Sequence, residues 1–398
     1  MGQSTLDVVA SQSNGAPLSF LTLPVDILFG IADHLSPVAL ARLVQTNRGL
    51  AIYLTRQLHR QALANKDNLS ALQWASKFGH DNLVRLALHS GADVNAQNDL
   101  VGNWTALHFA VSAGRIEIVK ILLDHGAKVN TWDSSRLTPL HCAVEGGYGG
   151  ITELLLSRGA DPSSASNRGM KPLQMTARLG NADIMGMLLR YGVDCNARTA
   201  DGATSLHVAA IFGRAKCAKM LLEHGACAEL RAEKGAGPIH LATLHQKLEV
   251  VQVLLDGGAD PDIQTSNGGT SLHVAAEAGF VDIAKALLKA GANPTIMNQY
   301  GSTPIHCAAM TGEEGVLETL LDYGTPVDIR GPQGRTALHI AAECVGLCTA
   351  AILIDYGADV LIKDDDGATA FDIAESLGPI GLEVANYLRV FMTLFPKL

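Results

Sequence analysis

The hexapeptide Thr204-Ser205-Leu206-His207-Val208-Ala209 decides the fold, because close copies of it recur at a fixed spacing along the chain. The other close copies begin at Thr105, Thr138, Thr270, Thr303 and Thr336, and more divergent ones at Ser70, Lys171, Gly237 and Thr369. The first interval between these starts is 35 residues, and every later interval is 33. A constant period of this size indicates a stack of equivalent supersecondary units rather than one globular core.

The residues of one period predict two short helices joined by tight turns. Thr can cap the first helix by accepting one of its free N–H groups, and Pro139 or Pro304 suits the first helical position. The Leu and Ala of the hexapeptide, three residues apart, face inward on that helix. A second apolar run, such as residues 118–123, supplies the inner face of a second helix, which Gly126 can end in the left-handed conformation. The Asp-, Asn- and Gly-rich segment that follows is typical of a tight turn.

The period and the Thr-Pro-Leu-His motif resemble the ankyrin repeat. The resemblance covers residues 67–398 in about ten copies. It implies an all-α fold, a curved solenoid of helix-turn-helix repeats with protruding hairpin fingers, in which each unit contacts mainly its neighbours. Gln73 and Asp372 replace the motif His in the first and last copies, as expected of terminal repeats. We expect residues 388–395 to form a closing cap helix.

Composition and charge exclude several classes of protein. Of the 398 residues, 47% are hydrophobic and only 17% charged, which favours a folded chain. Residues 69–398 carry 25 basic and 35 acidic groups, so we expect no direct nucleic-acid binding. No basic residue precedes Arg42, and prolines interrupt the uncharged stretch 8–25, so neither a secretory signal nor a membrane span is predicted. The seven scattered cysteines favour a reducing compartment, the cytoplasm or the nucleus.

The motif histidines are the most regular candidates for chemistry. They are His108, His141, His207, His240, His273, His306 and His339. A metal ladder or a catalytic array is conceivable, but one copy per unit is typical of packing, so we expect each ring to hydrogen-bond the helix cap and a neighbouring turn. Cys344 and Cys348 lack a partner pair at zinc spacing, and no phosphate loop or nucleophile elbow occurs. The sequence therefore predicts a protein that is not an enzyme and needs no metal, cofactor or small-molecule substrate.

Residues 18–66 depart from the 33-residue period and follow residues 1–17, which we expect to form a disordered tail. Their apolar spacing predicts three short helices. The apolar residues of these helices, which we call the F-box-like stripe, are Leu23, Pro24, Ile27, Leu28, Ile31, Leu35, Leu40 and Leu43, and Asn47-Arg48 follow them. It resembles the divergent F-box found ahead of ankyrin arrays in fungal proteins. The resemblance implies that these residues bind a Skp-type adaptor and so link the array's ligand to a cullin ubiquitin ligase. The open alternative is that the helices only cap the end of the repeat stack.

The resemblance to ankyrin proteins also implies a partner-binding groove, lined by finger tips and by the exposed side of each first helix. Transferred copy by copy, the positions in the earlier repeats are Trp104, Leu137, Met170, Arg178, Leu179, Ile211, Phe212, Leu244 and His245. In the later repeats they are Glu277, Gln299, Tyr300, Met310, Glu343, Asp365 and Asp366. The first set is mainly apolar and the second mostly polar or acidic. A row of exposed apolar side chains predicts a site for a protein partner, whereas the alternative is that some of them pack between repeats.

Two functions remain open at this point. The first is a non-catalytic, substrate-recruiting F-box subunit of a cullin-type ubiquitin ligase that holds its substrate in the ankyrin groove. The second is an ankyrin scaffold or transcription coregulator that binds a partner protein without any link to a ligase. Residues 18–66 are the feature that separates the two hypotheses.

Overall fold

The computed structural model describes residues 69–394. The expected tail, residues 1–17, and the F-box-like segment, residues 18–66, lie outside the described residues. Between residues 69 and 394 the chain forms twenty α-helices and three short 3-10 helices, and the isolated bridge between Asn98 and Trp104 is its only strand-like pairing. The chain divides into two compact units, residues 1–172 and residues 173–398.

In the described part of the first unit, helices alternate between two positions of the repeat. The first helices are α5 (Ala71–Phe78), α7 (Ala106–Ser112) and α9 (Pro139–Glu145). The second helices are α6 (Asp81–His89), α8 (Ile116–Asp124) and α10 (Gly149–Ser157), and the 3-10 helix η2 (Asp99–Val101) lies in the longer finger. Each helix contacts its pair mate, and within this unit equivalent helices of successive pairs also contact each other.

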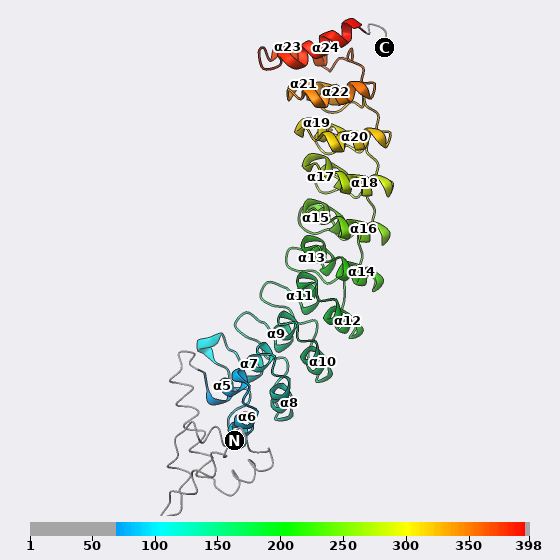
Figure 1. Ribbon diagram of the computed structural model, residues 1–398. Coiled ribbons are helices and arrows are strands. Elements are labelled where there is room, and N and C mark those ends of the chain that lie inside the picture. The colour runs from blue at the N-terminus through cyan, green and yellow to red at the C-terminus, as the bar shows by residue number, and fades with distance from the viewer. Residues whose placement is uncertain (1–68, 395–398) are drawn as a thin grey trace, which may run out of the picture. The chain divides into compact units, whose positions relative to one another are not determined.

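The second unit continues the same alternation. Its first helices are α11 (Pro172–Leu179), α13 (Ser205–Phe212), α15 (Pro238–Leu244), α17 (Ser271–Ala278), α19 (Pro304–Thr311), α21 (Ala337–Glu343) and α23 (Ala370–Ser376). Its second helices are α12 (Ala182–Arg190), α14 (Ala215–Glu223), α16 (Leu248–Asp256), α18 (Val281–Lys289), α20 (Glu314–Asp322), α22 (Leu347–Asp355) and α24 (Leu382–Leu394). Figure 1 shows the helices from α13 to α23 stacked in one column and those from α14 to α24 in another. Finger tips contain η3 (Glu233–Gly235) and η4 (Pro332–Gly334).

The predicted caps start the first helices. Thr204 has an extended backbone, its N–H donates to His207 Nδ1 at 3.2 Å, and its hydroxyl lies 2.9 Å from the same nitrogen. Two donors therefore meet one ring nitrogen, which fixes the first turn. At α15 the cap is Gly237, which has no hydroxyl, so only its N–H reaches His240 Nδ1, at 3.2 Å.

The turn between the two helices of a pair requires a left-handed residue. Glycine usually occupies this position, as in Gly213 with φ of 68°. Gln246 and Val345 are exceptions, with φ of 55° and 59°. A β-branched residue is strained in this region, because its Cβ crowds the following carbonyl.

The core consists of small and branched side chains between neighbouring helices. Leu206 and Ala209 of the hexapeptide are fully buried, as the spacing predicts. The end of the array differs in detail from the expectation. Residues 388–394 do not form a separate closing helix; they are the last turns of α24, the second helix of the final pair, and Phe395 lies outside the described residues.

Neighbouring fingers of the second unit are joined tip to tip by backbone hydrogen bonds. The N–H of Ser266 donates to the carbonyl of Lys234 at 3.0 Å, and that of Gln299 to the carbonyl of Asn267 at 2.8 Å. The equivalent position in the next finger is Pro332, which has no N–H to donate. The fingers thus lie side by side.

Candidate protein-interaction groove

The motif histidines connect adjacent repeats, as predicted. His207 Nδ1 accepts from the Thr204 N–H, so Nε2 carries the proton and donates to the Ala236 carbonyl at 3.2 Å. The corresponding acceptors for the other rings are the carbonyls of Leu137, Met170, Gly269, Ser302, Arg335 and Ala368. Burial lowers the pKa of all seven imidazoles, and it lowers those of His207 and His240 to about 4. Both nitrogens of each ring are occupied, so these histidines serve structure. In the part of the chain that the structure describes, no three His, Cys, Asp or Glu residues are grouped to hold a metal ion.

The predicted groove residues of the earlier repeats fall into two classes. Phe212 and Leu244 are exposed, by 46% and 59%, and His245 is exposed beside Leu244. These three side chains lie at the ends of α13 and α15 and are accessible to a partner. The side chains of Leu137, Met170, Leu179 and Ile211 are half-buried. The sequence left open whether the predicted groove residues are exposed or pack between repeats. The structure shows some of them exposed and others half-buried.

Trp104 belongs to the half-buried class and packs within its own unit. Its indole Nε1 donates to Asp133 Oδ2 of the next finger at 3.2 Å. Its ring lies edge-on to Phe109, with centroids 5.1 Å apart, and 5.9 Å from the His108 ring. Trp104 therefore ties two fingers together, and only part of its ring is open to a partner.

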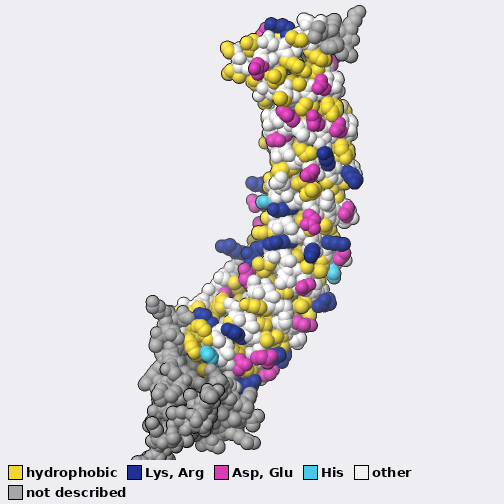
Figure 2. All heavy atoms as spheres, viewed as in Figure 1, with side chains coloured by type: hydrophobic (Ala, Val, Ile, Leu, Met, Phe, Trp, Pro, Cys, Tyr) yellow, Lys and Arg dark blue, Asp and Glu magenta, His cyan; other side chains and the backbone are white. Residues whose placement is uncertain are grey.

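Exposed apolar side chains continue into the later repeats. Tyr300 is 68% exposed at a finger tip, and Met310 is 51% exposed near the end of α19. Met297, which was not among the predicted groove residues, is 47% exposed. Leu100, in η2 of the longer early finger, was also not predicted and is 76% exposed. Met297 lies six residues before the cap of its helix, and Trp132 lies at the same position in an earlier finger. This shared position is the sequence signal that could have identified Met297 as a surface residue. In Figure 2 hydrophobic, acidic and basic side chains are intermixed over the visible face.

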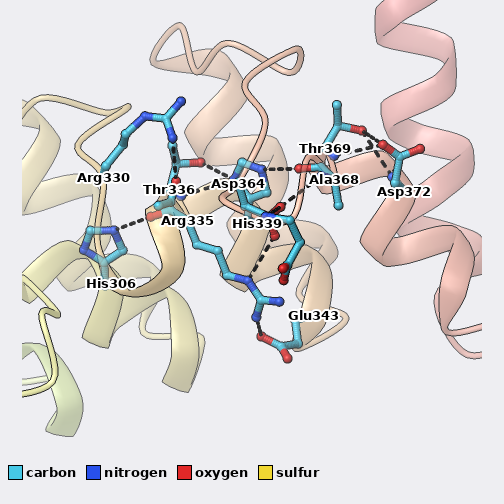
Figure 3. Close-up of polar contacts among 12 residues, drawn as sticks. His306, Arg330, Arg335, Thr336, His339, Glu343, Asp364, Ala368, Thr369 and Asp372 are labelled. Atoms are coloured by element: carbon cyan, nitrogen blue, oxygen red, sulfur yellow. Dashed lines mark hydrogen bonds and ion pairs between the residues drawn. The ribbon is translucent and has the colours of Figure 1, made fainter.

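We call the position directly before each helix-capping residue the finger slot. Arg335 fills the slot of the repeat that begins at Thr336 (Figure 3). Its Nε donates to Asp364 Oδ2 of the next finger at 3.3 Å, and its Nη1 donates to Glu343 Oε2 at the end of α21 at 2.9 Å. Trp104 fills the slot of its own repeat in the same way, with Asp133 as acceptor. In these two slots a side-chain donor joins a finger to the next one.

The acceptor in the Arg335 slot is a buried carboxylate. Asp364 Oδ1 accepts from the backbone N–H groups of Asp366 and Ala368, at 3.0 and 2.9 Å, which leaves Oδ2 for the guanidinium. Burial alone would raise the pKa of Asp364, but the hydrogen bonds from Ala368 and Arg335 outweigh it and hold that pKa below its usual value. The carboxylate is thus kept charged, as an arginine partner requires.

Other slots hold small residues and leave space. The slots of the repeats beginning at Gly237 and Thr270 contain Ala236 and Gly269. Next to them lies an open pocket of about 430 Å³, whose walls come from three adjacent fingers and from α17. Its lining residues include Lys234, Asn267, Gly269, Glu277, Asn298 and Gln299. Sequence reasoning placed Glu277 and Gln299 along the groove but did not find the pocket.

Paired helices, fingers bonded tip to tip and exposed side chains at the ends of the first helices define a helical-repeat protein that interacts with other proteins. A model of the family described as ankyrin repeats matches residues 72–166, 153–232, 226–298 and 291–364. The chain therefore belongs to the ankyrin-repeat family, whose repeats bind protein partners and are typically scaffolds without enzymatic activity.

One solved structure extends the comparison. The ankyrin repeat domain of Bcl-3, described as a unique member of the IkappaB protein family, is 28% identical to this chain with a TM-score of 0.50. The match covers 54% of this chain and 96% of the Bcl-3 chain. No curated protein matches this chain. Among the helices that the structure describes, none is long and apolar enough to cross a membrane.

Proposed function

We propose that this protein is the substrate-recruiting F-box subunit of a cullin-type ubiquitin ligase. The observation that carries the proposal is that one chain combines the F-box-like stripe of residues 18–66 with an ankyrin array that has exposed apolar side chains. Such a protein catalyses nothing itself. It raises the effective concentration of a bound substrate near the ligase.

The array would hold the substrate through its exposed groove residues. Phe212 and Leu244 lie at the ends of neighbouring first helices and are about half exposed or more. An aromatic side chain such as Phe212 can supply a large share of the binding energy when a partner covers it. The half-buried members of the row, Trp104, Leu137, Met170, Leu179 and Ile211, would supply the rest of the contact surface. The seven cysteines are free, which supports action in a reducing compartment, the cytoplasm or the nucleus.

Co-purification with the Skp-type adaptor tests the proposal. We expect the wild-type chain to retain the adaptor and the double variant Leu23→Ala/Pro24→Ala to lose it while the array keeps its helical content. Phe212→Ala is the matched control, because it alters the array and should leave adaptor binding unchanged. A wild-type chain that never retains the adaptor overturns the ligase proposal.

The alternative function is an ankyrin scaffold or transcription coregulator that binds a partner protein without a ligase. The observation that favours it is the likeness to the ankyrin repeat domain of Bcl-3. Under this alternative, partner binding persists in the Leu23→Ala/Pro24→Ala variant and no ubiquitin-ligase component accompanies it.

A further inference from the structure

The arginine clamp at Arg335 has a counterpart that lacks its arginine. Two 33-residue periods before Arg335, Glu343 and Asp364, the chain has Gly269, Glu277 and Asn298. Gly269 leaves the slot without a side chain, and Glu277 and Asn298 both line the pocket of about 430 Å³. The site that holds a guanidinium in one repeat is therefore an open pocket in the other, with room for a side chain and its flanking backbone.

The replacement of Asp364 by Asn298 changes the polarity of the pocket. Asn298 Oδ1 accepts from the backbone N–H groups of Tyr300 and Ser302, at 3.0 and 3.1 Å, as Asp364 Oδ1 does in its own finger. These two bonds fix the orientation of the Asn298 amide, so its Nδ2 takes the place of the carboxylate oxygen that accepts from Arg335. A hydrogen-bond donor thus stands where the arginine slot has an acceptor.

The charges that line the pocket cancel. Lys234 supplies one positive charge from a finger tip, and Glu277 supplies one negative charge from α17. In the described part of the chain no ion pair joins the two. Burial and the nearby Glu277 carboxylate raise the pKa of the Cys307 thiol to about 12, so the thiol adds no charge. Burial also keeps the His273 ring neutral by lowering its pKa. The remaining polar lining groups are hydroxyls and amides, and Ala236 and Val274 add apolar surface. A neutral occupant therefore adds no charge to a lining whose charges cancel.

We propose that this pocket binds a primary-amide side chain, glutamine or asparagine, presented by an extended segment of the partner protein. The amide oxygen of the ligand accepts from Asn298 Nδ2 and Lys234, and its NH₂ group donates to the Glu277 carboxylate. Lys234 and Glu277 are exposed and Asn298 is half-buried, so the preference comes from the direction of the hydrogen bonds. A guanidinium would place its N–H groups against the two donors, and a carboxylate would lie against the like charge of Glu277. The inference rests on the proposed function only in that the groove binds a protein.

The pocket can be tested with small probes, because the partner is not needed. N-acetyl-glutamine methylamide, N-acetyl-arginine methylamide and N-acetyl-glutamate methylamide are titrated separately into the isotope-labelled full chain. NMR shifts of the backbone amides of Glu277 and Gln299, which line the pocket and are unchanged in the variants below, are followed. We expect the glutamine probe to bind about fivefold more tightly than either charged probe, the contribution of roughly one hydrogen bond.

Two variants make the test decisive. Gly269→Met fills the slot as Met170 does in an earlier repeat, and Gly269 has no left-handed φ. An added Cβ would lie 3.3 Å from Asn267 Oδ1, a tight contact that a small shift of this exposed side chain relieves, so the fold should persist. This variant should abolish the shifts. Asn298→Asp restores the acceptor and should switch the preference to the arginine probe. The inference is overturned if the wild type prefers a charged probe, if no probe binds, or if Gly269→Met leaves the shifts unchanged. Adaptor co-purification is unaffected by any of these results, so the ligase proposal is judged separately.

Discussion

The His207 imidazole donates from Nε2 to the backbone carbonyl of Ala236, 3.2 Å away and 29 residues later in the chain. Its other nitrogen accepts from the Thr204 N–H, so one neutral ring connects the start of α13 to the next finger. Protonation of Nδ1 would place an N–H against an N–H and remove the cap. The same geometry recurs at each motif histidine, so the array depends on a series of neutral imidazoles.

The first prediction concerns pH. Burial lowers the folded-state pKa of His207 and His240 to about 4, whereas an unfolded histidine titrates near 6.5. The unfolded chain therefore takes up protons that the folded chain does not. The free energy of unfolding should keep its full value above pH 6.5 and fall as the pH is lowered towards 4. The loss should reach up to about 1.4 kcal/mol per pH unit for each such histidine. Urea unfolding at pH 7, 6 and 5 measures the slope.

His240→Gln is the control for this pH dependence. Gln73 shows that glutamine can replace the ring, because its Oε1 accepts from the Ser70 N–H at 3.1 Å and its Nε2 donates to the Ala96 carbonyl at 3.2 Å. The variant should fold and show a shallower loss of stability between pH 7 and 5. An unchanged slope would mean that His240 does not contribute to it.

The second prediction concerns the cap of α15. Gly237→Thr should stabilise the array by about 1 kcal/mol, because it adds the missing hydroxyl and reduces the freedom of the unfolded backbone. Gly237 has φ of −87°, and an added Cβ would meet no atom closer than 3.6 Å. Hydrogen exchange of the α15 amides measures the effect. Protection that stays the same or falls contradicts the prediction.

The third prediction concerns the strained turn before α22. Val345→Gly should stabilise this repeat by about 1 kcal/mol, since glycine tolerates the φ of 59° that valine adopts only under strain. Gln246→Gly, at φ of 55°, is the matched comparison and should gain less because glutamine is not β-branched. Thermal unfolding of the two variants and the wild type gives the order. A larger gain from Gln246→Gly would refute this account.

The fourth prediction separates the binding surface from the core. Phe212→Ala should leave stability nearly unchanged, because the ring is 46% exposed, but should weaken capture of the partner, since an aromatic anchor can contribute about 2 kcal/mol or more to binding. Leu206→Ala should cost about 2–5 kcal/mol of stability by leaving a cavity in a fully buried site. Unfolding and partner capture are measured on both variants. If Phe212→Ala unfolds the array as Leu206→Ala does, Phe212 belongs to the core.

Trp104→Ala should combine the effect of a surface variant with that of a core variant. The indole is half-buried and donates to Asp133, so we expect this variant to lose stability as well as any partner contact. It should therefore not be used alone as evidence for the groove.

The sequence by itself determined the repeat and its local chemistry. Three features could be predicted: the period, the Thr caps and the burial of Leu206 and Ala209. They depend on contacts within one repeat or between equivalent positions of adjacent repeats. The role of the histidines followed from the same regularity. Such interactions are readable because every copy presents the same residues at the same spacing.

Only the tertiary structure decided which variable positions are exposed and which slots are filled. Whether a residue before a helix cap faces solvent depends on the finger that follows it and on the end of its own first helix. Arg335 is held because Asp364 and Glu343 meet it, whereas Gly269 leaves a pocket between Glu277 and Asn298. The period marks the equivalent positions, but the residues at them differ from repeat to repeat, so the spacing does not show whether a slot is filled or open. Their juxtaposition exists only once the fingers are stacked.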